Sequence, residues 1–326
     1  MKSRGKRLVI TGLSLAAIAG FSHQASAQLN LTAYGSLRGF TISMFADKFP
    51  SSSNIGPLGI GFNGDGSVIV SDYPGNVRVF ATDTDGQHAN LVAPTSSSSV
   101  SNTVDIADAG GKHYITSQSA GTVRLLSNSG VLGAIVASGM VHPTGLATNP
   151  NNGHLFVSTY DGGNIWDLDP IAQTFTTFKG TSADGLSTDG TTLYAEVNGH
   201  ILGYNIATTN QVFDSGFLNC GADGTALGSG SLAGYLYVNC NNGLFKEIKL
   251  SDSSINDIAN GGTRGDFVRV DPNNGTLLIT QSNEIDRLIA PSGGGFGETP
   301  EPGVTASLIG VGVCASGLMF RKRARK

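Results

Sequence analysis

Short apolar runs alternate with clusters of turn residues along most of the chain, from about residue 40 to residue 290. The runs are rich in Val, Ile, Leu, Tyr and Phe, and Gly, Asn, Asp and Ser separate them. The first clear case passes from 59–62 through a turn to 68–71, and then through the loop 72–75 to 76–80. This pattern is typical of short β-strands joined by tight turns, and very little of it has the spacing of an amphipathic helix.

The same order of strand, turn and strand recurs in six units of similar length. The apolar residue that marks the first strand lies 46, 40, 40, 40 and 42 residues after the one before it, at Ile60, Ile106, Leu146, Leu186, Ala226 and Val268. A period near 40 residues with about four short β segments is typical of a β-propeller blade. We therefore predict an all-β fold, a six-bladed β-propeller over residues 28–297.

The two ends of the repeat region complement each other. The sixth unit stops near Ile289 after three strands, and the segment 40–45 forms a strand before the first unit with no partner there. We predict that this N-terminal strand becomes the fourth strand of the last blade. It would close the ring and cover sheet edges that would otherwise recruit other chains.

The strand-turn-strand pattern of the repeats resembles that of the NHL and SMP-30/gluconolactonase-like propellers. The best copy runs from His142 to Ala147 (HPTGLA) and continues from Asn152 to Val157 (NGHLFV). The resemblance implies a propeller, but such folds host many unrelated functions. SMP-30-like enzymes use a divalent metal to activate lactone or ester hydrolysis, so the resemblance also implies such a metal. In that family a Glu of the first blade and Asn residues of later blades hold it. The first unit here contains no Glu.

The N-terminal 27 residues have the layout of a secretory signal peptide. Four basic residues precede an apolar stretch at 8–21, and Ala25-Ser26-Ala27 fits a cleavage site with small residues at Ala25 and Ala27. We expect a signal helix, export through the Sec machinery and a mature chain that starts at Gln28.

The C-terminal segment 298–326 carries a second targeting pattern. Pro300, Glu301 and Pro302 precede an apolar run at 303–320, and the chain ends in a basic tip at 321–326. A run of this length is just able to span a bilayer as a transmembrane helix, and the basic tip would stay cytoplasmic. The segment resembles the PEP-CTERM sorting signal of Gram-negative bacteria that produce exopolysaccharide, and an ordinary membrane anchor is the alternative.

That resemblance implies a partner and a destination. The membrane enzyme exosortase would cut near the Pro-Glu-Pro motif. The protein would be anchored in the inner membrane before sorting. It would then reach the outer surface or the extracellular matrix, released or attached again.

The charge of the predicted mature body differs from that of the whole chain. Four of the 20 basic residues lie before residue 28 and five lie in the C-terminal tip, which leaves 11. Two of the 24 acidic residues lie in the tail, which leaves 22, so the body has a net charge of −11. Such a body repels nucleic acid phosphates, so nucleic acid is excluded as a partner. The charge serves solubility or attracts cations.

Candidate binding residues follow from the expected topology. In a propeller the loops between the second and third strands share a face with the start of the innermost strands, and loops on a rigid scaffold commonly carry binding residues. Our candidates for a ligand-binding face are Asp72, Tyr73, Tyr160, Asp161, Asn198, Asn241 and Asn283.

Four aspartates open inner strands at similar repeat positions, namely Asp105, Asp184, Asp223 and Asp266. They would point toward the mouth of the central channel. Two interpretations remain open: the carboxylates hold a hard divalent cation such as Ca²⁺, which prefers oxygen ligands, or each one caps its own turn.

Cys220 and Cys240 are the two cysteines outside the tail, and an oxidising compartment favours a disulfide between them. Both are expected at the same face of the fifth blade, so a bridge is geometrically reasonable.

Two functions remain in competition. The first is a non-catalytic surface or matrix protein that binds a glycan, an exopolysaccharide or a surface protein through this face. The second is a metal-dependent hydrolase of the lactonase or esterase type.

Overall fold

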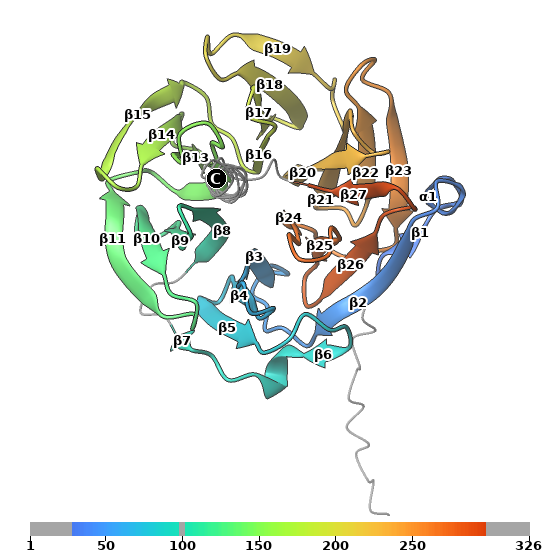
Figure 1. Cartoon of the computed structure of the whole chain (residues 1–326), viewed down its shortest axis with the longest axis horizontal. Coiled ribbons are helices and arrows are strands. Elements are labelled where there is room, and N and C mark those ends of the chain that lie inside the picture. The colour runs from blue at the N-terminus through green and yellow to red at the C-terminus, as the bar shows by residue number, and fades with distance from the viewer. Residues whose placement is uncertain (1–27, 98–101, 298–326) are drawn as a thin grey trace, which may run out of the picture.

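Six small antiparallel sheets stand around a common axis in the computed structural model, which describes residues 28–97 and 102–297 (Figure 1). The prediction of an all-β, six-bladed propeller is confirmed. The first three blades are β3 (Pro57–Phe62), β4 (Val68–Asp72), β5 (Asn76–Phe80) and β7 (Ser96–Ser97); β8 (Thr103–Ala109), β9 (Lys112–Ser117), β10 (Thr122–Leu126) and β11 (Leu132–Ser138); and β12 (Pro143–Thr148), β13 (Leu155–Thr159), β14 (Ile165–Asp169) and β15 (Thr174–Lys179).

The fourth blade has four strands, and the last two blades carry additional ones. Their strands are β16 (Leu186–Thr188), β17 (Thr192–Val197), β18 (His200–Asn205) and β19 (Gln211–Asp214); β20 (Ala222–Gly230), β21 (Tyr235–Cys240), β22 (Phe245–Lys249) and β23 (Ile255–Asn260); and β24 (Val268–Val270), β25 (Leu277–Thr280), β26 (Ile285–Ile289) and β2 (Thr41–Asp47). The first strand of each blade lies nearest the axis (Figure 1).

The N-terminal strand closes the ring, as predicted. β2 pairs antiparallel with β26, with Thr41 opposite Ile289 and Met44 opposite Asp286. The ring is therefore sealed by hydrogen bonds between two segments that lie more than 200 residues apart in the sequence. β6 (Gln87–His88) adds a short parallel strand outside β2, and the 3₁₀ helix η1 (Ala89–Leu91) follows it.

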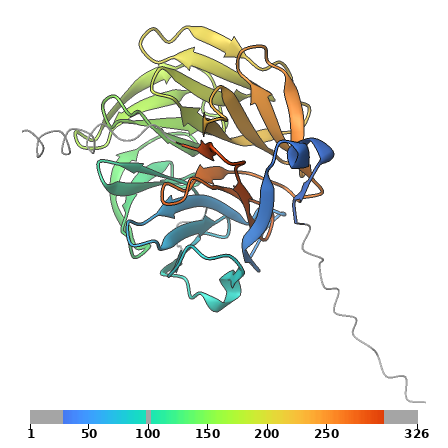
Figure 2. The same ribbon diagram turned by 45° about the vertical axis from the view of Figure 1, so that its right-hand side comes forward.

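Two further pairings extend the fifth blade, and the sequence did not indicate them. β1 (Asn30–Leu31) pairs with the outer strand β23, and α1 (Ala33–Leu37) follows it along the rim of the ring (Figure 2). β27 (Gly294–Phe296) pairs with the end of the inner strand β20. The fifth blade is thus bordered on both edges by segments from the two ends of the described chain.

The hydrophobic core is divided into clusters that fill the seams between neighbouring blades. Ile69 and Val77 of the first blade, for example, pack with Ile106 and Ile115 of the second. The seam between the last blade and the first contains Phe45 from β2, which is completely buried. Because each blade buries one face against each neighbour, most strands are apolar on both faces.

The inner strands carry a repeated irregularity near one end of the channel. In β3, β8, β12 and β20 the register shifts between the first paired residue and the residue three positions later, as in β12 between Pro143 and Leu146. Bulges of this kind aim side chains away from the regular alternation and are common next to binding sites. In the fifth blade Thr225, one residue before the predicted Ala226, lies opposite Val238 and takes the position of Leu146.

The predicted targeting segments lie outside the described residues. This holds for the signal peptide at 1–27 and for the Pro-Glu-Pro motif and apolar run at 300–320. Within the part of the chain that the structure describes, no helix has the length and apolar character needed to cross a membrane.

Candidate functional site

One residue from each inner strand surrounds the mouth of the channel, at the end where these strands begin. The strand registers show that six inner-strand residues are equivalent, namely Ile60, Ile106, Leu146, Leu186, Thr225 and Val268. The residue at the mouth is the one two positions before each of them. That position is occupied by Leu58, Val104, Thr144, Asp184, Asp223 and Asp266. The mouth therefore has an apolar half and an acidic half.

The apolar half of the mouth is filled by packed hydrophobic side chains. Leu58 and Val104 form a buried cluster with Phe267, and Ile55 and Tyr73 pack against it. The predicted binding residue Tyr73 thus belongs to this apolar cover.

Glycines let the acidic half converge. A Cβ atom on Gly185 would lie 2.0 Å from the carbonyl oxygen of Asp223, and one on Gly224 would lie 2.5 Å from the backbone nitrogen of Val268. Contacts that short exclude any side chain, so only glycine allows the inner strands of the fourth, fifth and sixth blades to lie this close. The close approach brings Asp184, Asp223 and Asp266 together.

Arg264 neutralises part of this acidic group. Its guanidinium lies 2.9 Å from Oδ1 of Asp266 and 3.8 Å from Oδ2 of Asp223. Arg264 stands in the loop that leads into the sixth blade, two residues before Asp266. The sequence analysis did not identify it.

The three carboxyl groups retain protons more strongly than free aspartate. Burial, together with the neighbouring charges of Glu196 and Asp266, raises the pKa of Asp184 to about 7, whereas a hydrogen bond with Asp223 opposes the rise. Burial and the charges of Asp184 and Asp266 raise the pKa of Asp223 well above its usual range. Burial also raises the pKa of Asp266, against the opposing effect of Arg264. Strongly shifted carboxyl groups in a cleft are candidates for a functional site.

A tight turn in the fourth blade places Glu196 beside this group. Asn198 and Gly199 have φ values of 54° and 80°, which fits the two-residue hairpin turn that Asn-Gly sequences favour. The Gly199 N–H donates to Oε1 of Glu196 at 2.6 Å, and burial raises the pKa of this carboxyl group. The predicted ligand residue Asn198 forms this turn.

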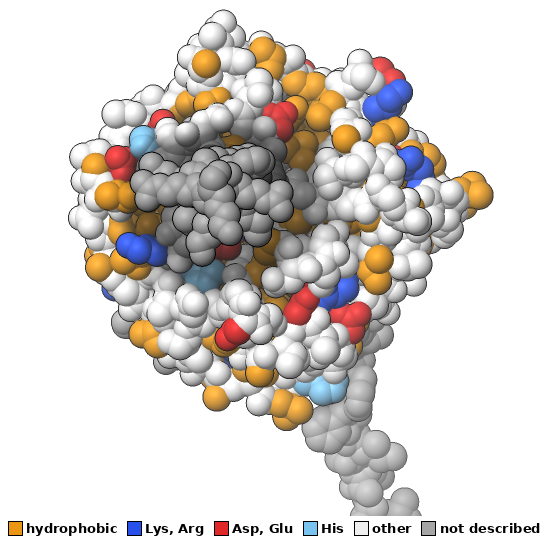
Figure 3. Space-filling view, viewed as in Figure 1, with side chains coloured by type: hydrophobic (Ala, Val, Ile, Leu, Met, Phe, Trp, Pro, Cys, Tyr) orange, Lys and Arg blue, Asp and Glu red, His pale blue; other side chains and the backbone are white. Residues whose placement is uncertain are grey.

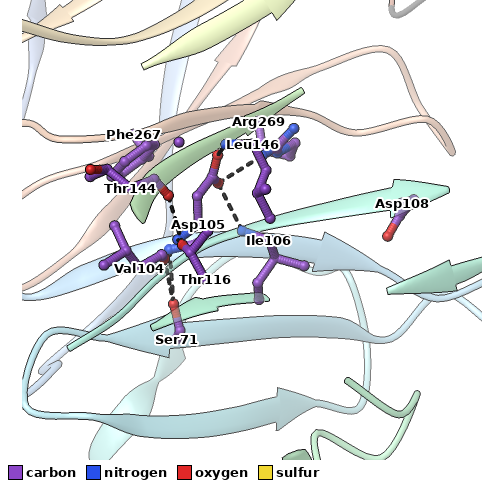
Figure 4. Close-up of polar contacts among 12 residues, drawn as sticks. Ser71, Val104, Asp105, Ile106, Asp108, Thr116, Thr144, Leu146, Phe267 and Arg269 are labelled. Atoms are coloured by element: carbon purple, nitrogen blue, oxygen red, sulfur yellow. Dashed lines mark hydrogen bonds and ion pairs between the residues drawn. The ribbon is translucent and has the colours of Figure 1, made fainter. Parts of the chain in front are cut away.

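The structure separates Asp105 from the other three aspartates. Its Oδ1 accepts from Arg269 Nη2 at 2.7 Å and from the Ile106 N–H at 2.8 Å, and its Oδ2 accepts from the Leu146 N–H at 2.8 Å (Figure 4). The physical reason is a shift of one residue, because Asp105 directly precedes Ile106 whereas Asp184, for example, lies two residues before Leu186. Asp105 is therefore a link between blades and not a member of the carboxylate group at the mouth.

The donor set at the mouth fits a resident metal ion poorly. Three buried oxygens there accept no hydrogen bond from the described residues, namely Asp184 Oδ1, Asp266 Oδ2 and Asn239 Oδ1. However, within residues 28–97 and 102–297 no group of three or more His, Cys, Asp or Glu side chains is arranged to hold a metal. Arg264 already supplies a positive charge to two of the aspartates.

A polar pocket lies next to the acidic half of the mouth. Its volume is about 540 Å³. It is lined by Ser51, Asn54, Asn241, Asn242, Gly262, Thr263, Arg264, Ser282 and Asn283. Two predicted ligand residues, Asn241 and Asn283, belong to it, and the buried Oδ1 of Asn241 has no hydrogen-bond partner among the described residues.

The disulfide supports one wall of this pocket. Cys220 and Cys240 are joined with their Cα atoms 5.4 Å apart. The bridge stands directly before Asn241, whose N–H also donates to the Gly221 carbonyl at 2.8 Å. The loop that carries Asn241 is thus held covalently to the segment that enters the fifth blade.

The remaining candidates lie outside the pocket. Asp72 is completely buried, forms an ion pair with Arg78 and accepts from the Asn76 N–H at 2.9 Å, so it has a structural role. Tyr160 is 62% exposed, and Asp161 pairs with His142 Nδ1 at 2.6 Å. Neither Tyr160 nor Asp161 lines the pocket.

The channel also contains a cavity on the side of the opposite face. Its volume is about 400 Å³, and its walls come from the later residues of the inner strands together with Phe296 and Gly297. Apolar side chains are visible inside the hollow at the centre of the ring in Figure 3. The sequence analysis did not predict this cavity, because β27 gave no repeat signal.

Comparisons with known proteins support the fold. No family model matches the chain, and no curated protein matches it. A gluconolactonase from Xanthomonas campestris has a TM-score of 0.64 and 14% identity, and the match covers 81% of this chain and 95% of that one.

Two other structures are similar to a comparable extent. A streptogramin B lyase has a TM-score of 0.56 and 12% identity, with 77% of this chain and 98% of that one covered. An auxiliary nutrient binding protein from Bacteroides thetaiotaomicron has a TM-score of 0.56 and 12% identity, with 80% and 77% covered. At such low identity, similarity to enzymes and to a binding protein alike establishes the propeller fold only.

Proposed function

We propose that this protein is an exported binding protein that takes a polyhydroxylated ligand, such as a glycan or a unit of an exopolysaccharide, in the polar pocket beside the channel mouth. The observation that carries the proposal is the lining of that pocket, in which amide and hydroxyl side chains predominate and, among the described residues, only Arg264 is charged. Such groups donate and accept hydrogen bonds in fixed directions, which suits a ligand rich in hydroxyl groups.

The pocket is well built for a rigid ligand site. Asn241 and Asn242 follow the disulfide, and Asn283 lies in the loop between β25 and β26. The buried Oδ1 of Asn241, which has no hydrogen-bond partner among the described residues, is an acceptor whose burial costs free energy until a donor reaches it. Arg264 is itself held by Asp266, which fixes its guanidinium at the edge of the pocket.

Calorimetric titration of the mature chain with purified exopolysaccharide fragments and with a panel of neutral and acidic oligosaccharides tests the proposal. The variants Asn241→Ala and Asn283→Ala should each weaken binding about three- to tenfold, the effect of one neutral hydrogen bond. The exposed Asn210, on the hairpin between β18 and β19, provides the control Asn210→Ala, which should bind normally. Absence of heat with every saccharide would refute the glycan assignment.

We propose further that the two ends of the chain direct its export and sorting. The support is the residue pattern: cleavage after Ala27 by the secretory route, and a Pro300-Glu301-Pro302 motif before an apolar run and a basic tip. Exosortase would act near the motif, and the propeller would leave the inner membrane for the outer surface or the matrix. The intact mass of the protein recovered from the cell surface tests this, since replacing the three motif residues with alanine should leave the C-terminal tail attached.

A metal-dependent hydrolase remains the second candidate. The observation that favours it is the convergence of Asp184, Asp223 and Asp266 from adjacent blades, with oxygens of Asp184 and Asp266 free of hydrogen bonds from described residues. A divalent ion such as Ca²⁺ would require Arg264 to leave two of these carboxylates.

Elemental analysis and calcium titration distinguish the candidates. A stoichiometric ion that is lost in Asp184→Ala and Asp223→Ala would favour the hydrolase and would justify screening lactones and esters. Saccharide binding that persists in both aspartate variants and in a chelator would favour the binding protein.

A further inference from the structure

Two buried acidic residues lie at the start of β26, and no cationic side chain among the described residues pairs with them. Glu284 directly precedes β26 and Asp286 is the second residue of that strand, and the charge of Glu284 helps to raise the pKa of Asp286, so the two carboxyl groups are neighbours. Glu284 is 1% exposed, and neither of its oxygens accepts a hydrogen bond from the described residues. Asp286 is completely buried; its Oδ2 accepts from the Leu29 N–H at 3.2 Å, and its Oδ1 has no partner among those residues.

The charged side chains near this pair do not compensate it. Asp47 of β2 adds negative potential at Glu284, and it is itself paired with His88. Arg287 lies on the other face of β26, where it pairs with Asp83, Asp85 and Asp271. Within residues 28–97 and 102–297 no Lys, Arg or His side chain forms an ion pair with Glu284 or Asp286. An unpaired carboxylate is costly to bury, so such a group either keeps its proton or meets a cation.

The beginning of the predicted mature chain is fixed beside these carboxylates. Leu29 is buried in the seam between the fifth and sixth blades, next to Gly262. The side chain of Asn30 donates to the carbonyl oxygen of Gln28 at 2.8 Å, and Asn30 pairs with Asn260. Standard backbone dimensions place the nitrogen of Gln28 about 3–4 Å from that of Leu29, which already touches Asp286.

We propose that Glu284 and Asp286 form a binding site for a primary ammonium group, and that its ligand is the α-ammonium of Gln28, set free when the chain is cut after Ala27. Before the cut, the nitrogen of Gln28 is a neutral amide. After the cut, it carries a positive charge one residue from the Leu29 N–H that donates to Asp286. Processing of the N-terminus thus supplies the missing charge at the seam that β2 closes, and it stabilises the ring.

With no cation paired to them among the described residues, both carboxyl groups hold their protons more strongly than free acids do. Burial, with the charge of Asp47 as a lesser cause, raises the pKa of Glu284 to about 7. Burial and the charge of Glu284 raise the pKa of Asp286 to about 8, although the Leu29 N–H opposes this. An ammonium nearby would lower both values, and the carboxylates would in turn raise the pKa of the amine.

The proposal uses the predicted cleavage position but is independent of the ligand in the polar pocket. N-terminal sequencing of the exported protein, together with the pKa of the α-amine, separates the two possible failures. A mature chain that starts elsewhere refutes the cleavage, whereas a chain that starts at Gln28 with an ordinary amine refutes the ammonium site.

The test measures the pKa of the α-amine by NMR after reductive methylation with ¹³C-formaldehyde. The chain from residue 28 to 326 is prepared with Gln28→Ser, which prevents cyclisation of the terminal glutamine, and again with Ser26 and Ala27 retained. We expect the α-amine of the shorter chain to titrate about one pH unit above the usual range of about 7.7–8.0, so that the fraction of neutral amine at pH 7 falls about tenfold. The extended chain should show the ordinary value.

The carboxylates provide the decisive control. In the shorter chain, Glu284→Gln combined with Asp286→Asn should return the α-amine to its ordinary pKa, and the resonance of the exposed Lys112 should not change. If the double variant does not fold, Asp286→Asn alone serves the same purpose. An ordinary pKa in the shorter chain, or a raised pKa that survives these substitutions, would overturn the proposal.

Thermal unfolding at pH 8 gives a second readout. The shorter chain should melt at a higher temperature than the extended chain, and the difference should disappear in the carboxylate variants. Excess calcium chloride could instead raise the melting temperature of both chains equally, and only when the carboxylates are present. In that case the Glu284–Asp286 pair is a metal site and the proposal is wrong.

Discussion

Arg269 of the sixth blade extends across the channel to Asp105 of the second blade, with Nη2 2.7 Å from Oδ1 (Figure 4). The same carboxylate accepts backbone N–H groups of Ile106 and of Leu146 in the third blade. One buried side chain therefore joins three blades at the axis. The second and sixth blades both adjoin the first blade and share no seam with each other, so this contact connects parts that the seams do not.

Replacement of Asp105 should be costly. Asp105→Asn removes the charge from a pair whose two side chains are 3% and 13% exposed, and breaking a buried pair in this way typically costs about 3–5 kcal/mol. We expect a loss of that size in the free energy of unfolding measured with urea. The control is Asp161→Asn in the loop after β13, because Asp161 and its partner His142 are 53% and 50% exposed, and exposed pairs contribute about 0–1 kcal/mol. Equal losses in the two variants would contradict the role assigned to Asp105.

The closing strand should contribute to the stability of the whole ring. Phe45 of β2 is completely buried, and its ring lies 5.4 Å from that of Phe80 in the first blade. Phe45→Ala should lower the free energy of unfolding by about 3–5 kcal/mol, the usual cost of a large cavity. The exposed Thr41 in the same strand provides Thr41→Ala, which should change it by less than about 0.5 kcal/mol. Independent unfolding of the last blade in hydrogen exchange, with the other blades unaffected, would show that closure is local.

The repeat and its closure were predictable because both rest on patterns that many residues share. The six inner-strand positions recur at intervals near 40 residues, and the segment around Phe45 is an apolar strand without a local partner. In contrast, β27 pairs with β20 through Gly294 and Gly295, which carry no apolar alternation. The same is true of β1, which has only two residues.

The candidate site was predictable only in part, because its geometry depends on shifts of one residue. Asp105 and Asp184 look equivalent in the sequence, yet the strand registers place them at positions that differ by one, and a shift of one residue reverses the direction of a side chain in a strand. The role of Arg264 depends on contacts with Asp223 and Asp266 that no local pattern announces. Burial, which determines the charge state of Glu284, is likewise a property of the folded seam.

Loss of the disulfide should destabilise the propeller and loosen the polar pocket. Cys220 and Cys240 enclose a loop of 20 residues, and the chain-entropy model assigns about 3 kcal/mol to closing a loop of this size. Cys220→Ala with Cys240→Ala should lower the free energy of unfolding by about that amount and weaken saccharide binding through Asn241. Counting free thiols in the unfolded chain by mass spectrometry checks the bridge, because only Cys314 should react before reduction. Three reactive thiols would show that the bridge does not form.

The carboxyl groups at the channel mouth should make the protein less stable as the pH rises. Asp184 has a pKa of about 7 in the folded chain and the ordinary value of 3.8 when unfolded, so between these pH values the folded state holds a proton that the unfolded state has lost. The stabilisation is complete below the unfolded pKa and is lost as the pH rises through the folded one. Urea unfolding between pH 4 and pH 8, in the presence of a chelator, measures this slope.

Asp184→Asn isolates the contribution of this group, because asparagine resembles the protonated carboxyl and does not ionise. At pH 8 the variant should be more stable than the natural chain by about 1–2 kcal/mol, equivalent to roughly one pKa unit after allowance for partial exposure, and the two should converge near pH 4. Asp214→Asn is the control of opposite sign: hydrogen bonds from His200 and Gly216 lower the pKa of Asp214, so its stabilising contribution is present at high pH and is lost on acidification. A difference between the Asp184 variant and the natural chain that stays constant from pH 4 to pH 8 would mean that the carboxyl group of Asp184 does not retain its proton in the folded protein.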